Sequence, residues 1–198
     1  TYNSTTKLYT VVSGFPVTLP LIGIGTGTTQ SQTGSITMAQ DSTGKLWATY
    51  PGTGPGGDGN YRAIWSTSAD HKIWDTTGFI LATGGATITQ EVTNIVHFGG
   101  NKIGVAWSHQ LAPIEDGFRY HVDGDPENVW STKEIIDSGL GNEEGVGGVA
   151  DNHGSMRSAP DGRIFLVAKD SDNVGYLHLY TRTTAGVWSA NPALVDID

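Results

Sequence analysis

Short apolar runs that follow tight-turn residues recur three times along the chain. The runs are residues 45–50, 102–107 and 163–168. The turns before them are residues 41–44, 99–101 and 160–162. These turns are rich in glycine, asparagine and aspartate, which tolerate positive φ. The pattern predicts a strand after a tight turn at three equivalent places.

A second marker repeats in phase with the first. Trp74, Trp130 and Trp188 follow one another at intervals of 56 and 58 residues. A shared period of about 57 residues lies a little above the range of roughly 40 to 50 that is typical of β-propeller blades. The sequence therefore predicts an all-β fold of three four-stranded antiparallel repeats, at about 35–83, 93–138 and 153–197, after an N-terminal strand and linker in 1–34.

Each repeat divides into four predicted strands separated by turn residues. The strands are 35–40, 45–50, 61–66 and 73–81; 93–98, 102–108, 118–122 and 129–136; and 154–158, 163–169, 175–181 and 187–195. The repeated tryptophans begin or lie in the fourth strands, and we expect them to be buried between neighbouring repeats. Three blades fall short of the roughly four that a closed propeller needs. We therefore expect a larger propeller or a ring completed by a second copy, with residues 7–18 as an extra outer strand.

The turns before the tryptophans carry a family resemblance. Residues 68–74, 123–130 and 181–188 resemble the bacterial neuraminidase repeat, Ser/Thr-x-Asp-x-Gly-x-x-Trp, with Glu127 and Ala185 in place of the glycine in the second and third copies. Residues 148–169 are also similar to secreted bacterial propeller proteins that carry an Ala-Asp-Asp-His segment, although Asn152 replaces the second aspartate. The resemblance implies a sialidase-like propeller architecture and not, by itself, sialidase activity.

Composition narrows the partners. The chain has 20 acidic and 11 basic residues and a formal net charge of −9, so it offers no basic stripe for nucleic acid. No apolar run reaches the roughly 18 residues of a membrane helix. Cysteine is absent, and the abundance of Thr, Ser, Asn and Gly favours a secreted, extracellular protein.

The predicted ligand face collects the loops after the second and fourth strands. His153, Arg157 and Asp151 are the candidate catalytic residues there, and Glu143, Glu144, His109 and Asp116 are candidate ligand-binding residues. Strand alternation places His153 and Arg157 on one side, toward a central channel, where they could bind a carboxylated sugar. The competing interpretation is that these side chains tie neighbouring repeats together.

The kind of chemistry stays open at this stage. A glycosidase needs two carboxyl groups about 5 to 9 Å apart across one bond, and Glu143 and Glu144 are adjacent, so they would point to opposite faces of a strand. Only Arg157 of the arginines falls on an inner strand, so a complete sialidase site is not expected. An enzyme with this sequence would be a glycoside hydrolase or a polysaccharide lyase acting on an anionic glycan.

One turn carries acids at alternate positions. Asp123, Asp125 and Glu127 could hold calcium, but the EF-hand glycine and distal glutamate are missing, and the tryptophan turn of a repeat is the competing interpretation. No other cofactor is expected. The leading functional hypothesis is a carbohydrate-recognising or carbohydrate-processing module. The alternative is an extracellular structural or assembly subunit joined by strand addition.

Overall fold

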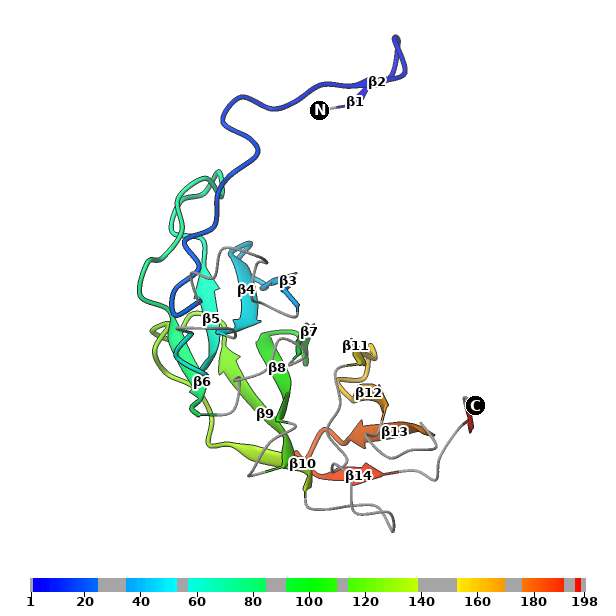
Figure 1. The fold of residues 1–198 in the computed structure, drawn as a ribbon. Helices are drawn as coiled ribbons and strands as arrows, with labels where there is room; N and C mark the ends of the chain where they lie inside the picture. Colours follow the sequence, from blue (N-terminus) through cyan, green and yellow to red (C-terminus); the bar gives the residue numbers. More distant parts are fainter. Residues whose placement is uncertain are drawn as a thin grey trace.

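The computed structural model of the chain describes residues 2–24, 35–52, 57–84, 92–109, 114–138, 153–169, 176–190 and 195–196. All regular structure in these residues is β-strand, which confirms the predicted all-β class (Figure 1). Within these ranges, no helix is long and apolar enough to cross a membrane.

Three antiparallel sheets are built from consecutive strands, as the repeat predicted. Sheet 1 contains β3 (Thr37–Gln40), β4 (Leu46–Pro51), β5 (Tyr61–Trp65) and β6 (Phe79–Ala82). Sheet 2 contains β7 (Thr93–Phe98), β8 (Lys102–His109), β9 (Glu115–Val122) and β10 (Glu134–Ser138). Sheet 3 contains β11 (Gly154–Ser158), β12 (Ile164–Lys169), β13 (Tyr176–Arg182), β14 (Trp188–Ala190) and β15 (Val195–Asp196), which pairs with β13. Two short strands, β1 (Tyr2–Asn3) and β2 (Leu8–Tyr9), form a separate hairpin.

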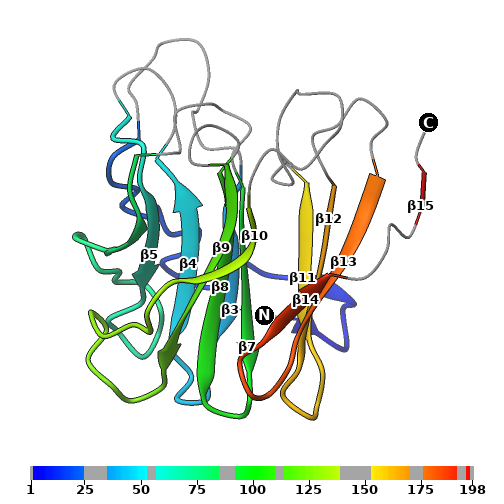
Figure 2. The same ribbon diagram turned by 90° about the horizontal axis from the view of Figure 1, so that it is seen from below.

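The three sheets stand side by side, and their first strands β3, β7 and β11 contact one another in that order (Figure 2). In the described part of the chain they form an open row and do not close into a ring. The tight turns β3–β4, β7–β8 and β11–β12 lie at the same end of the strands in all three sheets, and we call this end the turn edge. Strands β4, β8 and β12 finish at the other end, which we call the loop edge.

Sheet 2 is buried on both faces, and the alternation of its strands explains how. Ile103, Val105 and Trp107 of β8 pack against sheet 1. Ala106, between them, belongs to the core shared with sheet 3. Gly104 also faces sheet 3, where a Cβ would collide with the rings of Phe118 and Phe98. A central strand therefore needs apolar or small residues at every position.

The repeated tryptophans occupy similar turns but differ in their neighbours. Trp130 stacks on Phe79 of sheet 1, with ring centroids 5.3 Å apart. Trp188 packs edge-on against Phe118 of sheet 2 at 5.3 Å. These two lie between neighbouring sheets, as expected, but they are only partly buried there. Trp74 is buried under the N-terminal segment instead of a neighbouring repeat.

The fourth strands of sheets 1 and 2 begin later than predicted. Trp74 and Trp130 donate their indole N–H groups to the carbonyls of His71 and Glu127, both at 2.9 Å, so each tryptophan belongs to the turn before the strand. In sheet 1 only an isolated bridge joins Trp74 to Ser66. The turn geometry, which strand patterning does not reveal, accounts for the shift.

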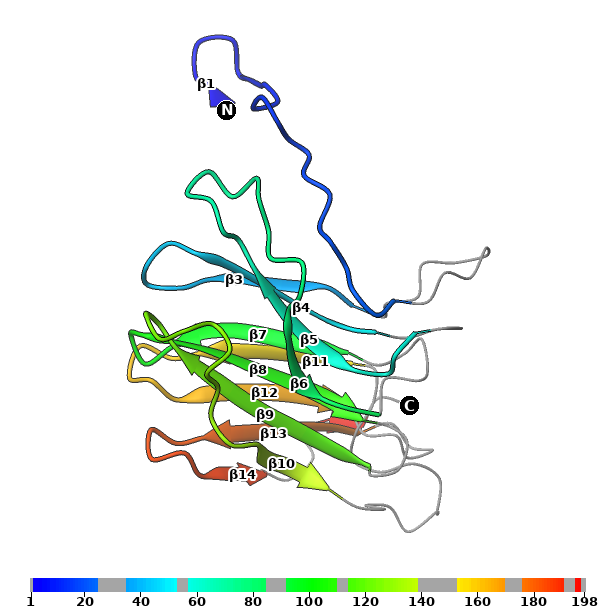
Figure 3. The ribbon, with the colours of Figure 1, turned by 90° about the vertical axis from the view of Figure 1, so that its left-hand side faces the viewer.

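The predicted N-terminal outer strand over 7–18 is wrong. Its only strand, β2, pairs with β1 in a hairpin that extends away from the three sheets (Figure 3). Downstream, Val17, Leu19, Leu21 and Ile24 pack on the face of sheet 1 that sheet 2 does not cover. The Tyr50 hydroxyl, at 2.8 Å from the Ile22 nitrogen, fixes this segment. The N-terminal residues therefore cover a sheet face instead of extending a sheet.

Candidate functional site

The loop edge of sheet 2 gathers polar and aromatic side chains at the ends of β8 and β9. Trp107, Ser108 and His109 end β8, and Glu115 and Asp116 begin β9; we call these five residues the loop-edge cluster. The strand register places Ser108 opposite Asp116 and His109 opposite Glu115. Because side chains alternate, Trp107, His109 and Glu115 face sheet 1, whereas Ser108 and Asp116 face sheet 3.

The half of the cluster that faces sheet 1 is built around His109. The Tyr61 ring lies edge-on to the imidazole, with centroids 6.0 Å apart, and its hydroxyl donates to the Ser108 carbonyl. Glu115 accepts two hydrogen bonds from the Lys133 ammonium, at 2.7 and 2.9 Å. Burial lowers the pKa of His109; the Glu115 carboxylate opposes this shift and Lys133 adds to it. The imidazole is therefore neutral at neutral pH.

The half that faces sheet 3 lines a narrow crevice between β8–β9 and β11–β12. Asn94, Ser108 and Asp116 line it from sheet 2, and His153, directly before β11, lines it from sheet 3. Its volume is about 10 Å³, roughly enough for one water molecule. The crevice can therefore admit one functional group of a ligand but not a sugar ring.

Several of the buried polar side-chain atoms that have no hydrogen-bond partner among the described residues lie at this edge, whereas others, such as Arg119 Nε and Asp123 Oδ1, lie elsewhere. Those at the loop edge are Thr93 Oγ1, Trp107 Nε1, Ser108 Oγ and His109 Nε2. By contrast, the indole nitrogens of Trp47, Trp74, Trp130 and Trp188 all donate hydrogen bonds. An unsatisfied buried polar group costs roughly 1 to 3 kcal/mol. Such a group in a native protein calls for an explanation, and an unfilled ligand or water position is one.

The structure brings some of the predicted site residues together and separates others. His153 and Asp116 share the crevice. His109 and Asp116 were expected on one loop face but lie on opposite faces of sheet 2. His109 is paired with Glu115, and Asp116 is the residue after Glu115, so its side chain points to the other face. Asp151, Glu143 and Glu144 lie outside the described residues.

Arg157 does not point toward a central channel, contrary to expectation. Met156, next to it, packs into the core between sheets 2 and 3, so Arg157 lies on the other face of sheet 3, in register with Phe165. Its guanidinium donates to the Met156 carbonyl at 2.8 Å. The side chains of a first strand point toward the neighbouring sheets on either side. Its backbone, and not its side chains, borders the space between the first strands.

Sequence reasoning gave no role to Tyr61 or Lys133 and did not pair Glu115 with His109. That pairing follows from the hairpin register, so a register assigned from the turn would have found it. Lys133 precedes β10, and nothing in the local pattern around it signals its contact with Glu115.

The three acids of the candidate calcium turn contact different partners. Asp123 accepts a hydrogen bond from the Ser42 nitrogen at 2.8 Å. Glu127 forms an ion pair with Lys45 of sheet 1. Asp125 lies in the exposed part of the turn. In the described ranges, no three His, Cys, Asp or Glu residues form a group that could hold a metal ion. Calcium binding here stays an untested prediction.

Comparison with solved structures shows a likeness of fold. No family model matches the chain, and no curated protein matches it. A solved structure of an N-acetylgalactosamine deacetylase from F. plautii, in complex with blood group B trisaccharide, is similar with a TM-score of 0.51 and 13% sequence identity. The likeness covers 87% of this chain and 56% of that chain, so the chain spans about half the length of that structure. At this identity the likeness concerns the fold.

Proposed function

We propose that the chain is a carbohydrate-recognising module of sialidase-like propeller architecture, whose loop-edge cluster contacts the sugar. The observation that carries the proposal is the group of unpartnered buried polar atoms at the end of β8. A protein of similar fold that acts on N-acetylgalactosamine and is seen with a bound trisaccharide supports a sugar as the ligand. Secretion is part of the proposal and rests on composition alone.

The chemistry of the cluster suits a polyol. A sugar hydroxyl both donates and accepts, so it can pair with a neutral imidazole, a serine hydroxyl and an indole N–H. Tyr61, packed on Trp107 with ring centroids 6.1 Å apart, is buried against the His109 imidazole and holds it in place. A neutral His109 would also serve as a general base if the module processes its glycan.

Recognition fits the described carboxylates better than glycoside hydrolysis does. Hydrolysis needs two carboxyl groups that flank one glycosidic bond. Glu115 and Asp116 are adjacent in β9 and face different sheets, and Glu115 is paired with Lys133. These two acids therefore cannot flank the same glycosidic bond.

The architecture proposed here is a set of propeller blades extended by further sheets or by a second copy. Neighbouring first strands contact one another, as the inner strands of blades do. The face of sheet 3 that is turned away from sheet 2 carries half-buried Phe165, Val167 and Leu179. Such an apolar face is suited to packing against another sheet.

An assembly subunit is the second candidate, and the N-terminal arm favours it. Leu8, Tyr9 and Val11 are 63%, 83% and 80% exposed on a segment that leaves the body of the protein. An extended apolar segment of this kind can pair with a neighbouring chain. A mass in solution that depends on residues 2–16 would favour this function.

Ser108→Ala tests carbohydrate recognition. Removing an unsatisfied buried hydroxyl should leave the free energy of unfolding unchanged or raise it. The same change should weaken binding of the blood group B trisaccharide, or of the strongest ligand on a glycan array, by about tenfold. Ser189→Ala, at an exposed serine of β14, is the matched control. Loss of stability with unchanged binding in Ser108→Ala would contradict the proposal, as would an array without ligands.

A further inference from the structure

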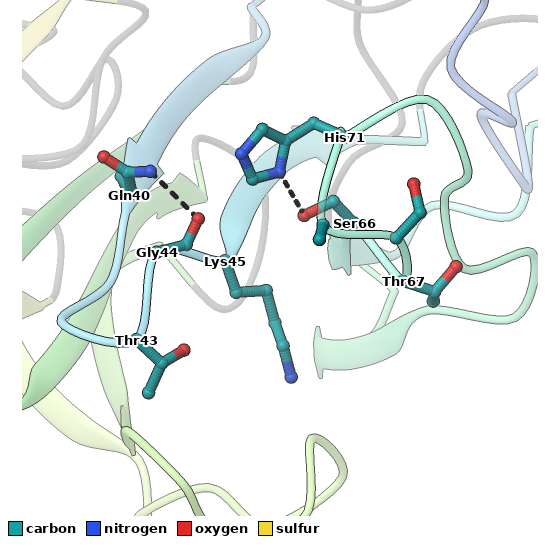
Figure 4. Close-up of a pocket in the computed structure, with 9 residues that line it drawn as sticks. Gln40, Thr43, Gly44, Lys45, Ser66, Thr67 and His71 are labelled. Atoms are coloured by element: carbon teal, nitrogen blue, oxygen red, sulfur yellow. Dashed lines mark hydrogen bonds between the residues drawn. The ribbon is translucent and has the colours of Figure 1, made fainter.

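A second pocket lies at the turn edge of sheet 1, between the β3–β4 turn and the loop that leads to β6. Its volume is about 420 Å³, within the roughly 300 to 1,000 Å³ of small-molecule sites. Gln40, Thr43, Lys45, Ser66, Thr67 and His71 contribute side chains to it (Figure 4). We call it the turn-edge pocket. It lies at the edge of the sheets opposite the loop-edge cluster.

His71 has an uncommon backbone conformation for a residue with a side chain. Its φ is 58°, in the left-handed region that glycine occupies readily. Its carbonyl accepts the Trp74 indole N–H, as the carbonyl of Glu127 accepts that of Trp130, so both stand at the glycine position of the repeat. Strained residues cluster at functional sites. The chain therefore has a histidine at a position where glycine would be less strained.

A hydrogen bond with Ser66 orients the ring of His71 and bears on which ring nitrogen carries the hydrogen. Ser66 Oγ accepts the Leu46 N–H at 3.0 Å, so its own hydrogen is available for His71 Nδ1, 3.1 Å away (Figure 4). In the neutral ring the other nitrogen, Nε2, then carries the hydrogen and is a donor. In this tautomer the ring presents a donor at the wall of the pocket.

Two further side chains complete the binding groups. Lys45 is paired with Glu127 and, having three N–H donors, has two more for a ligand. Gln40 donates its amide nitrogen to the Gly44 carbonyl at 2.9 Å, which leaves its Oε1 as an acceptor. None of the described residues that line the pocket carries a carboxylate, although Glu127 pairs with Lys45 and Asp70 accepts a hydrogen bond from Ser68 beside it. The pocket therefore combines basic donors with a neutral acceptor.

We infer that the turn-edge pocket binds one acidic sugar residue. Lys45 and His71 bind its carboxylate or sulfate, and Gln40 Oε1 accepts a hydrogen bond from a ring hydroxyl. Charge-assisted bonds to an oxyanion are about twice as strong as neutral ones, so the acidic group supplies most of the selectivity. The inference does not depend on the function of the loop-edge cluster.

Calorimetric titration with D-glucuronate, galactose 6-sulfate and D-glucose tests the inference. Glucuronate, the sulfated sugar or both should bind the native protein, and glucose should bind about tenfold more weakly or not at all. The sugar that binds identifies the preferred oxyanion. Equal binding of all three sugars, or of none, would overturn the inference.

Three variants locate the site. His71→Gly suits the left-handed backbone, so it should fold normally and lose about tenfold in affinity for the acidic sugar. Gln40→Glu, which places a carboxylate in the pocket, should abolish acidic-sugar binding by repulsion. Lys72→Ala removes a neighbouring lysine that does not line the pocket and should bind as the native protein does. Native affinity in both pocket variants would refute the assignment.

The outcome is separable from that of the loop-edge cluster. Ser108→Ala should retain acidic-sugar binding at the turn-edge pocket whether or not it affects the other ligand. Loss of acidic-sugar binding in a folded Ser108→Ala protein would place that binding at the loop edge and contradict the present assignment.

Discussion

Replacing Glu134 by alanine should weaken the contact between sheets 2 and 3. Glu134 begins β10, and its carboxylate accepts two bonds from the Arg182 guanidinium, both at 2.7 Å, and one from the Trp188 indole at 2.9 Å. Arg182 is only 6% exposed and lies 5.2 Å from the centre of the Phe118 ring. Without Glu134, a buried cation and an indole N–H both lose their acceptor.

The expected loss follows from the burial of the two partners. Breaking a buried ion pair by removing one member costs about 3 to 5 kcal/mol, because the other charge stays buried. The Glu134 side chain is 21% exposed, so solvent can partly replace it, and we expect the lower value of about 3 kcal/mol. For a chain of this length, that corresponds to a fall in Tm of about 6 to 12 °C.

Urea denaturation followed by tryptophan fluorescence measures this loss. Asp161→Ala is the control, because it removes an ion pair between Asp161 and Arg163 whose side chains are 52% and 48% exposed, and it should destabilise the protein much less than Glu134→Ala does. Glu134→Gln, which keeps an acceptor for Trp188, should lie between the two. A loss below about 1 kcal/mol in Glu134→Ala would refute the role given to this ion pair.

Two further predictions concern the turns. Trp130→Ala should lower the free energy of unfolding by about 3 kcal/mol, because it removes the ring stacked on Phe79; a loss below about 1 kcal/mol by urea denaturation would contradict this. Burial alone would raise the pKa of Asp41, but hydrogen bonds from Trp47, Thr43 and the backbone outweigh it and lower the pKa below 3.8. The folded state then binds fewer protons, so this stabilisation is present above 3.8 and is lost as the pH falls through the lowered pKa. Asp41→Asn should flatten that part of the acid-denaturation curve; equal slopes would disprove the shift.

The repeated sheets could be predicted because their signals are local. A glycine-type turn followed by an apolar run specifies a strand wherever it occurs, and three copies of it defined the three sheets. The start of β6 could not be predicted in this way, since it depends on an indole hydrogen bond from Trp74 to His71. The N-terminal segment was misassigned because its apolar residues fit a strand and a covering segment equally well.

The candidate site was predictable only in part, for a geometric reason. His109 and Asp116 were both assigned to the loop face from their positions in the chain. Which side of the sheet each one faces depends on the β8–β9 register, and a shift of one residue reverses it. Arg157 shows the same limit, because Met156 beside it is the residue that packs against sheet 2.

The most direct test of carbohydrate recognition uses the indole N–H signals of the six tryptophans. In a ¹H–¹⁵N correlation spectrum titrated with the strongest glycan-array ligand, we expect the signal of Trp107 to shift, because its indole nitrogen is buried at the loop edge without a partner. The signals of Trp130 and Trp188, whose indoles already donate hydrogen bonds, should stay in place. Saturating binding that leaves the Trp107 signal unmoved would contradict the assignment of the sugar site to the loop-edge cluster.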